Sequence, residues 1–364
     1  MTGRERFLMA LSNGEPDRLP CQVHHWMHYY LKTYLNDCSQ LQAYECFGMD
    51  PVLYVSPKFQ FAERDKANWQ IEYDTSRTDA DGYSIWGYTV KTPKGNLRCR
   101  GASNQFTGWT TEHLIKSEGD FAIWDEFVPV PVAADWTEAR DALAAIGERG
   151  ITRGYPYDFG QGSPWQSLCT MMDIEPAIMA AIDKPQWVHH CLESMLHKKL
   201  RALEATGIVG DLVETGGGAG SNTVISPAMH EEFCVPYDTR QHAALHACGV
   251  KIVYHLCGGL MKMLPLVARN GADGIETMTP PSMGGDCDIV QAAAAVSHKL
   301  FFIGGFDQNA GFEKGTPALA RAMVHELHAA RPRGGYICCP SDHFFFGDPA
   351  NIQAFADAAK ECTY

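Results

Sequence analysis

From about residue 150 to its end, the chain alternates short apolar runs with longer segments of helical periodicity. This alternation is typical of strand–helix units around a parallel sheet, because parallel strands need a crossover connection. The predicted strands in this part are residues 151–154, 211–214, 252–255, 274–277, 301–304 and 336–339. Two earlier apolar runs, residues 19–23 and 52–55, bring the number to eight, which closes a (β/α)8 TIM barrel.

Residues 58–130 interrupt this rhythm. Polar and apolar residues alternate in 70–73 and 83–90, and Pro93-Lys94-Gly95 is typical of a hairpin turn. We therefore expect an α/β fold in which one TIM-barrel domain covers residues 1–364, with an antiparallel β insertion near the barrel mouth.

The charge and cysteine content limit the classes of partner and compartment. The net charge is -13 and no run of Lys and Arg is present, which argues against a nucleic acid or an anionic membrane as partner. The first 20 residues lack an apolar stretch of signal-peptide length, and no window is apolar enough to span a bilayer. An odd number of cysteines, 13, suits a reducing compartment, so we expect a cytoplasmic protein.

The strongest chemical feature is His255-Leu256-Cys257-Gly258-Gly259, where a predicted strand ends. Residues two apart on an extended segment point the same way, and imidazole and thiolate are both good zinc ligands. In a barrel, that strand end lies on the active face. The alternative is a core histidine beside an inert cysteine.

Further ligand types end neighbouring predicted strands. Glu276 ends the next strand, although a carboxylate there can also cap a helix or form a surface ion pair. The last strand supplies Cys338 and Cys339, of which only one can face inward. A catalytic zinc usually has three protein ligands and an open position. We predict a zinc site made of His255, Cys257, Glu276 and Cys339; whether Cys338 or Asp342 takes the place of Cys339 stays open.

Several segments together resemble the uroporphyrinogen decarboxylase superfamily, from residue 3 to beyond residue 355. They are GRERFLMALSNGEPDRLP, NTVISPAMHEEFCVPY, HACGVKIVYHLCGG, GADGIE, IGGFDQ, GGYICCPSDH and DPANIQAF. The resemblance implies a TIM barrel with its active site in a cleft at the carboxyl ends of the strands. The porphyrin-decarboxylating members carry an Arg-x-Ala-Gly-Arg motif after the first strand, because a polycarboxylate needs guanidinium partners. This chain has QVHHWMHYYLKTY there, and YVSPKF where the catalytic Asp is expected, so that activity is disfavoured.

The chain is more similar to the methyltransferase branch, in which a His-x-Cys pair binds zinc. That resemblance carries over to His255 and Cys257, and Glu276 has the spacing of a further ligand in related methionine synthases. It implies a corrinoid carried by a partner protein, since this chain has no corrinoid-binding motif. In that branch a second cysteine, late in the sequence, also binds zinc, and this chain has Asp342 at the matching position. Members of the superfamily are often homodimers, although the sequence itself has no interface signal.

A zinc with few thiolate ligands is a strong Lewis acid, which would ease departure of an alkoxide or phenolate. We therefore favour transfer of a methyl group from a small O-methylated compound, such as a methoxylated aromatic, to the corrinoid. A transfer from methyl-corrinoid to a thiol such as coenzyme M is the alternative. A uroporphyrinogen decarboxylase-like lyase and a non-catalytic binding subunit also stay open.

Other residues near the predicted mouth are candidates for substrate contact and proton transfer. The aromatic residues Trp26, Tyr157 and Trp165 follow predicted strands and could line an aromatic cavity, although barrel rims often carry aromatics. Asn222 and Asp307 are further candidate substrate contacts, and Asp307 can equally cap its loop. Glu214 and His343 are candidate catalytic residues, and His24, His25 and His28 candidate acids. The glycine-rich loop 216–220 would let backbone approach a large partner such as the corrinoid ring.

Overall fold

The computed structural model describes residues 1–157, 159 and 162–364. They form two compact units, which we describe separately. The first consists of Met1–Ser56, Trp136–Pro156 and Val209–Tyr364, and the second of the described residues within Pro57–Asp135 and Tyr157–Ile208.

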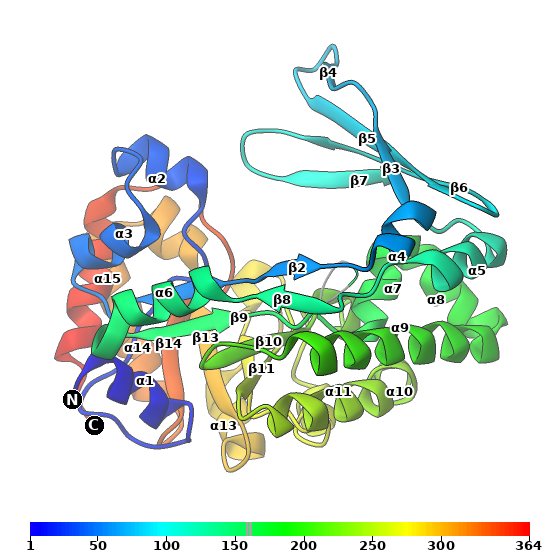
Figure 1. Cartoon of the computed structure of the whole chain (residues 1–364). Coiled ribbons are helices and arrows are strands. Elements are labelled where there is room, and N and C mark those ends of the chain that lie inside the picture. Colours follow the sequence, from blue (N-terminus) through cyan, green and yellow to red (C-terminus); the bar gives the residue numbers. More distant parts are fainter. Residues whose placement is uncertain (158, 160–161) are drawn as a thin grey trace. The chain divides into compact units, whose positions relative to one another are not determined.

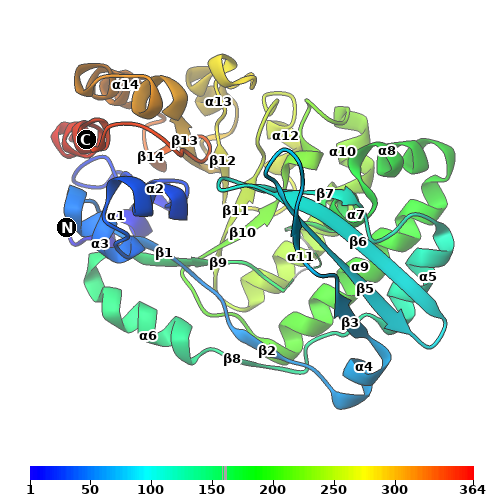
Figure 2. The same ribbon diagram turned by 90° about the horizontal axis from the view of Figure 1, so that it is seen from above.

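The first unit is built on a curled parallel sheet (Figures 1 and 2). Seven strands follow the order β1-β9-β10-β11-β12-β13-β14, and every neighbouring pair is parallel. The predicted α/β fold with a parallel sheet is confirmed. The strands are β1 (Val52–Val55), β9 (Ile151–Gly154), β10 (Leu212–Gly216), β11 (Lys251–His255), β12 (Gly274–Thr277), β13 (Phe301–Phe306) and β14 (Tyr336–Pro340).

The predicted eighth strand, residues 19–23, is not a full strand. It forms a single parallel bridge, Cys21 to Cys338, supported by two backbone hydrogen bonds to β14. Within the described residues, the named strands make an open seven-stranded sheet, so closure of the barrel is not confirmed. Pro20, which lacks an N–H group, contributes only its carbonyl oxygen to this pairing.

Helices of the first unit follow the strands and pack on the outside of the sheet, as Figure 2 shows for α6, α13 and α14. Ser226 and Asp348 cap α10 and α15, and each is followed by Pro at the first helical position, which favours a helix start. The helical elements are α1 (Gly3–Ala10), α2 (His28–Tyr34), α3 (Gln40–Phe47), α6 (Thr137–Ile146), η1 (Gly147–Arg149), η2 (Gly218–Gly220), α10 (Pro227–Phe233), α11 (Val235–Ala247), α12 (Leu264–Val267), η3 (Pro281–Met283), α13 (Ile289–Val296), η4 (Asn309–Glu313), α14 (Pro317–Ala330) and α15 (Pro349–Glu361).

The second unit holds the antiparallel strands that the alternating pattern predicts. Strands β5 and β6 pair along their whole length, and Pro93-Lys94 form the turn between them. The strands are β2 (Lys58–Gln60), β3 (Gln70–Tyr73), β4 (Arg77–Thr78), β5 (Ser84–Thr92), β6 (Gly95–Ser103), β7 (Gly108–Glu112) and β8 (Ala133–Asp135). The helices are α4 (Glu63–Asn68), α5 (Glu118–Phe127), α7 (Pro164–Met172), α8 (Ile174–Asp183) and α9 (Pro185–Thr206). No helix in the described parts of the chain is long and apolar enough to cross a bilayer.

Candidate functional site

Four charged side chains lie on one face of four successive strands of the first unit. Arg153 pairs in register with Leu212, two residues before Glu214 on β10. Glu214 pairs with Val253, two residues before His255, and His255 pairs with Glu276. Because alternate residues of a strand share a face, Arg153, Glu214, His255 and Glu276 all point to the same side of the sheet.

These four side chains form a buried network of ion pairs. The Arg153 Nη2 atom donates to Glu214 Oε2 and to Glu276 Oε1. His255 Nδ1 lies 2.8 Å from Glu276 Oε1 and 3.6 Å from Glu214 Oε1. Arg153 and Glu276 are 0% exposed, Glu214 is 4% exposed and His255 is 9% exposed. We refer to these four residues as the charged cluster.

The network stabilises the charged forms of its members. Burial alone would raise the pKa of Glu276, but the charge of Arg153 and the hydrogen bond from His255 hold it well below its usual range. Burial alone would lower the pKa of His255, but hydrogen bonds with Cys257 and Glu276 raise it well above the usual value. Likewise, the carboxylates overcome the effect of burial on Arg153 and raise its pKa.

The donor atoms of this site fit a divalent metal ion. One ligand atom each from Glu214, His255 and Glu276 lie within 4.8 Å of one another. Glu276 Oε2 is buried and has no hydrogen-bond partner among the described residues, so an acceptor for a cation is present there. His255 Nδ1 is the ring nitrogen that faces both carboxylates, so an ion held by all three residues would be bound through Nδ1, in place of the present hydrogen bond to Glu276.

Cys257, half-buried in the loop after β11, hydrogen-bonds His255, but the group of potential ligand atoms within 4.8 Å does not include it. A Cβ atom on Gly218 would lie 2.6 Å from Cys257 Sγ, and a Cβ atom on Gly216 would lie 2.5 Å from the His255 carbonyl oxygen. The glycines of this loop therefore make room for the His255-Cys257 segment of the same chain.

The register of β14 decides which of its two cysteines shares the face of the charged cluster. Cys339 pairs with Gly305, and Cys338 pairs with Gly304, next to Ile303, which pairs with Glu276. Alternation therefore puts Cys339, and not Cys338, on that face. Cys339 is fully buried, and Gln22 Nε2 lies 3.7 Å from its sulfur atom. Burial raises the pKa of the Cys339 thiol, and the group of potential ligand atoms within 4.8 Å does not include it.

Three imidazole rings form a row that begins beside the charged cluster. The ring centroids of His24 and His255 are 5.5 Å apart, those of His24 and His343 are 5.0 Å apart, and those of His25 and His343 are 5.9 Å apart. Burial lowers the pKa of His24 to about 3, whereas the side chain of His343 is 41% exposed and lies 3.2 Å from Asp342. His28 lies further along, with an 80% exposed side chain.

The predicted substrate residues are dispersed. Trp26 is 2% exposed and stacks on Phe47 in a buried aromatic cluster, so its packing explains it without a ligand. Tyr157 and Trp165 belong to the second unit, where Tyr157 Oη donates to the Pro129 carbonyl and Trp165 is fully buried on α7. Asn222 is half-buried and its backbone N–H donates to Gly259.

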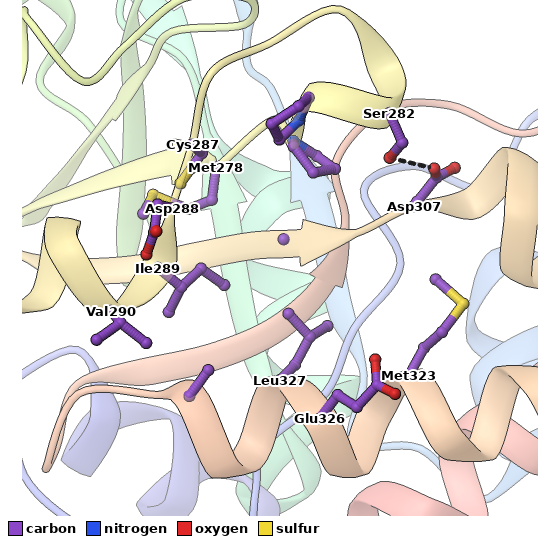
Figure 3. Close-up of a pocket in the computed structure, with 14 residues that line it drawn as sticks. Met278, Ser282, Cys287, Asp288, Ile289, Val290, Asp307, Met323, Glu326 and Leu327 are labelled. Atoms are coloured by element: carbon purple, nitrogen blue, oxygen red, sulfur yellow. Dashed lines mark hydrogen bonds between the residues drawn. The ribbon is translucent and has the colours of Figure 1, made fainter.

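Asp307 lies at the edge of a pocket of about 470 Å³ beside β13, α13 and α14. Its carboxylate accepts hydrogen bonds from Ser282 Oγ at 2.6 Å and from the Ala310 backbone N–H at 2.9 Å. Figure 3 shows the Ser282 side chain directed at Asp307, while Met323 and Leu327 line the apolar part of the same pocket. These bonds fit the loop-capping role that its sequence position also allowed.

Sequence reasoning missed two residues around the cluster, Arg153 and Tyr54. The signal for Arg153 was a charged residue within the apolar run of a predicted strand. Tyr54, in register with Arg153, packs its ring 5.2 Å from the guanidinium carbon. Tyr155, an aromatic residue that directly follows β9, is 39% exposed, stacks on Tyr54 and hydrogen-bonds Glu214.

Comparison with known proteins gives both a family and a fold. The model of the family described as "Uroporphyrinogen decarboxylase (URO-D)" matches residues 156–362. Uroporphyrinogen decarboxylases from strains of Xanthomonas campestris pv. campestris are 24% identical over 252 residues, which is 66% of this chain but only 64% of theirs. A methyltransferase from Methanosarcina mazei has a similar fold, with a TM-score of 0.66, 13% identity and 99% of both chains covered.

Proposed function

The chain belongs to the uroporphyrinogen decarboxylase family, and on this basis we propose that it is a zinc-dependent methyltransferase. The methyl group would move from a small O-methylated compound to the corrinoid of a separate protein. The observation that carries this proposal is the buried group of His255, Glu276 and Glu214 at the carboxyl ends of three adjacent parallel strands. The reaction class in this proposal is taken from the name of the Methanosarcina mazei methyltransferase. The structural similarity to that protein supports only the fold.

His255, Glu276 and Glu214 would hold the metal, with Cys257 beside them as a further donor. Bound zinc supplies Lewis acidity toward an ether oxygen, which favours departure of that oxygen when the methyl carbon is attacked. Oxygen-rich ligation keeps this acidity higher than several thiolates would. The hydrogen bond between Glu276 and His255 Nδ1 holds these two candidate ligands next to each other.

The imidazoles outside the cluster suit a second task in such a reaction, which is to stabilise the oxygen that departs from the methyl group. His343 is partly exposed and lies beside His24, which lies beside His255. A row of imidazoles from the cluster toward solvent can donate a hydrogen bond or a proton to a departing oxygen. Tyr155, stacked on Tyr54, offers a flat exposed ring for a planar substrate.

A closed barrel would bring these groups to one end of the sheet. We propose that residues 19–23 serve as the eighth strand, which the parallel bridge between Cys21 and Cys338 supports. His24 and His25 would then follow a strand end, as His255 and Glu276 end theirs.

The charges of the cluster disfavour a porphyrinogen decarboxylase. A polycarboxylate substrate requires cationic partners, but the guanidinium of Arg153 is already engaged by Glu214 and Glu276. Transfer of a methyl group to a thiol is the second candidate, because Cys257 adjoins His255 and Cys339 shares the face of the cluster. A zinc bound through both cysteines would favour that acceptor.

The test is the zinc content per chain, measured by elemental analysis after anaerobic, chelator-free purification. We expect one zinc ion per chain, lost in His255→Ala and in Glu276→Gln. The matched control is His242→Gln, which alters another buried histidine, on the other side of the sheet, and should keep its zinc. Loss of zinc in Cys339→Ala would favour the thiol acceptor, and retention would favour the ether donor.

The reaction itself is tested by mixing the protein with a reduced corrinoid protein and methoxylated aromatics. A change of the corrinoid absorbance to that of the methylated form is expected, and it should disappear in Glu276→Gln. Wild-type protein without zinc would contradict the proposal.

A further inference from the structure

Arg153 places a full positive charge inside the charged cluster, and the proposed reaction has no step for it. Its side chain is 0% exposed. Its Nε and Nη1 atoms are also buried and have no hydrogen-bond partner among the described residues. With no exposed surface, the guanidinium offers no face to a substrate, so it acts through the groups that it contacts.

Those groups are the two carboxylates that would hold the metal. Arg153 Nη2 donates a hydrogen bond to one oxygen atom of each carboxylate, Glu214 Oε2 and Glu276 Oε1. Glu276 Oε2 is left without a partner, and Glu214 Oε1 lies 3.6 Å from His255 Nδ1. A metal ion bound by His255 would therefore share both carboxylates with Arg153.

The sum of charges shows what this sharing does. Two carboxylates and one guanidinium carry a net charge of about -1. When a divalent ion is bound and the imidazole is neutral, the net charge of the whole site becomes about +1. Without the guanidinium, the same site would be neutral when loaded. Like charges a few ångströms apart in a protein repel strongly enough to change an affinity by about tenfold or more.

We propose that Arg153 is a positioning residue that competes with a divalent cation for Glu214 and Glu276, weakening metal binding and leaving the bound metal more electrophilic. The identity of that cation as zinc rests on the proposed function. The competition itself rests only on the shared carboxylates. A residue with a merely structural role would have the opposite effect, since its removal would loosen the site and weaken binding.

The experiment compares full-length wild type, Arg153→Lys and Arg153→Met by titrating Zn²⁺ against a chromophoric chelator. Arg153→Met should bind Zn²⁺ about tenfold or more tightly than wild type, whereas Arg153→Lys, which keeps the charge, should stay within about threefold. Zn²⁺ should also raise the melting temperature of Arg153→Met more than that of wild type. The d–d absorption of bound Co²⁺ provides a spectroscopic check that the ion lies in a protein site. Equal or weaker Zn²⁺ binding by Arg153→Met overturns the proposal.

Loss of Arg153 leaves two buried carboxylates uncompensated, which can prevent folding. A second pair, Glu214→Gln and Glu214→Gln/Arg153→Met, avoids this because the double variant loses opposite charges together. The double variant should bind Zn²⁺ about tenfold more tightly than the single one, and equal or weaker binding overturns the proposal. If wild type binds no Zn²⁺, the proposed function fails. In that case, Zn²⁺ binding by Arg153→Met would still support the proposed competition, and no Zn²⁺ binding by this variant would overturn it.

Discussion

A histidine is buried on each side of strands β10 and β11, but the two imidazoles differ in their polar contacts and in the direction of their pKa shift. On one side, Glu214 and His255 belong to the charged cluster. On the other side, the next residues along the same strands, Thr215 and Tyr254, contact helix α11 through His242 and Asp238. We call this second set, Thr215, His242, Tyr254 and Asp238, the rear network.

The difference between them lies in what the buried imidazole contacts. His255 lies beside carboxylates, and its pKa is raised. His242 bonds Thr215 Oγ1 at 2.8 Å and the Asn270 carbonyl at 2.7 Å, and burial lowers its pKa to about 4. The charged cluster therefore retains charge at neutral pH, whereas the rear network keeps a satisfied, uncharged imidazole. Four expected outcomes test this contrast, from the largest effect to the smallest.

Removing Glu276 should have the largest effect on stability. Glu276→Ala leaves Arg153 with one carboxylate in a fully buried position, and breaking a buried ion pair costs about 3–5 kcal/mol. Urea denaturation in the presence of EDTA measures this loss without a contribution from metal. Arg321→Ala, which breaks an exposed pair with Glu361, is the control and should change the free energy of unfolding far less, because solvent screens that pair. A similar cost for both variants would mean that the charged cluster is not a buried ionic network.

Acidification should destabilise the protein partly through His242. The unfolded imidazole takes up a proton near pH 6.5, but the folded one does so only near pH 4, so the unfolded state gains the proton first. Stability is therefore fully present above about pH 6.5 and falls toward pH 4, by up to about 3 kcal/mol from this residue. His242→Gln should flatten the pH dependence of the unfolding midpoint between pH 7 and pH 4.5. An unchanged slope would show that His242 is not buried in its neutral form.

The Tyr254 hydroxyl should contribute less than either of these. Tyr254 Oη donates to Asp238 Oδ2 at 2.6 Å in a buried position. Tyr254→Phe removes this bond but keeps the ring, so about 2 kcal/mol of stability should be lost. Zinc content should not change, because Tyr254 points away from the charged cluster. A loss of zinc in Tyr254→Phe would show that the two sides of the strands are coupled.

The exposed ion pair of His246 with Asp273 should matter least. Its atoms are 2.8 Å apart, but the His246 side chain is 42% exposed. His246→Gln should change the free energy of unfolding by under about 1 kcal/mol, and by less at high salt. A calorimetric comparison at low and high salt measures both effects. A larger loss would mean that this pair belongs to the rear network.

Much of the fold could be predicted from the sequence, since local periodicity carries it. The apolar runs at 52–55, 151–154 and 274–277 form strands with those bounds. The strand predicted at 19–23 is not confirmed, because only the single bridge between Cys21 and Cys338 joins that segment to β14. His255 and Glu276 could be placed together because both end adjacent strands.

The missed parts of the site share a physical cause. Arg153 lies within a fully buried strand, and its role depends on carboxylates 61 and 123 residues away in the chain. Trp26 follows a predicted strand, as an active-site aromatic would, yet it packs against Phe47 in the core. The sequence cannot distinguish an active-site side chain from a core side chain, because the same residue type occurs in both places.

The sequence alone determined the strand and helix pattern, the family resemblance and the ligand types at the strand ends, because these depend on residue order over short distances. Only the tertiary structure decided that Cys339 and not Cys338 shares the face of His255, that the glycine loop makes room for Cys257, and that Arg153 shares both candidate carboxylates. Those outcomes depend on strand register and on which side chains meet across the sheet. Contacts of that kind arise only when distant segments pack.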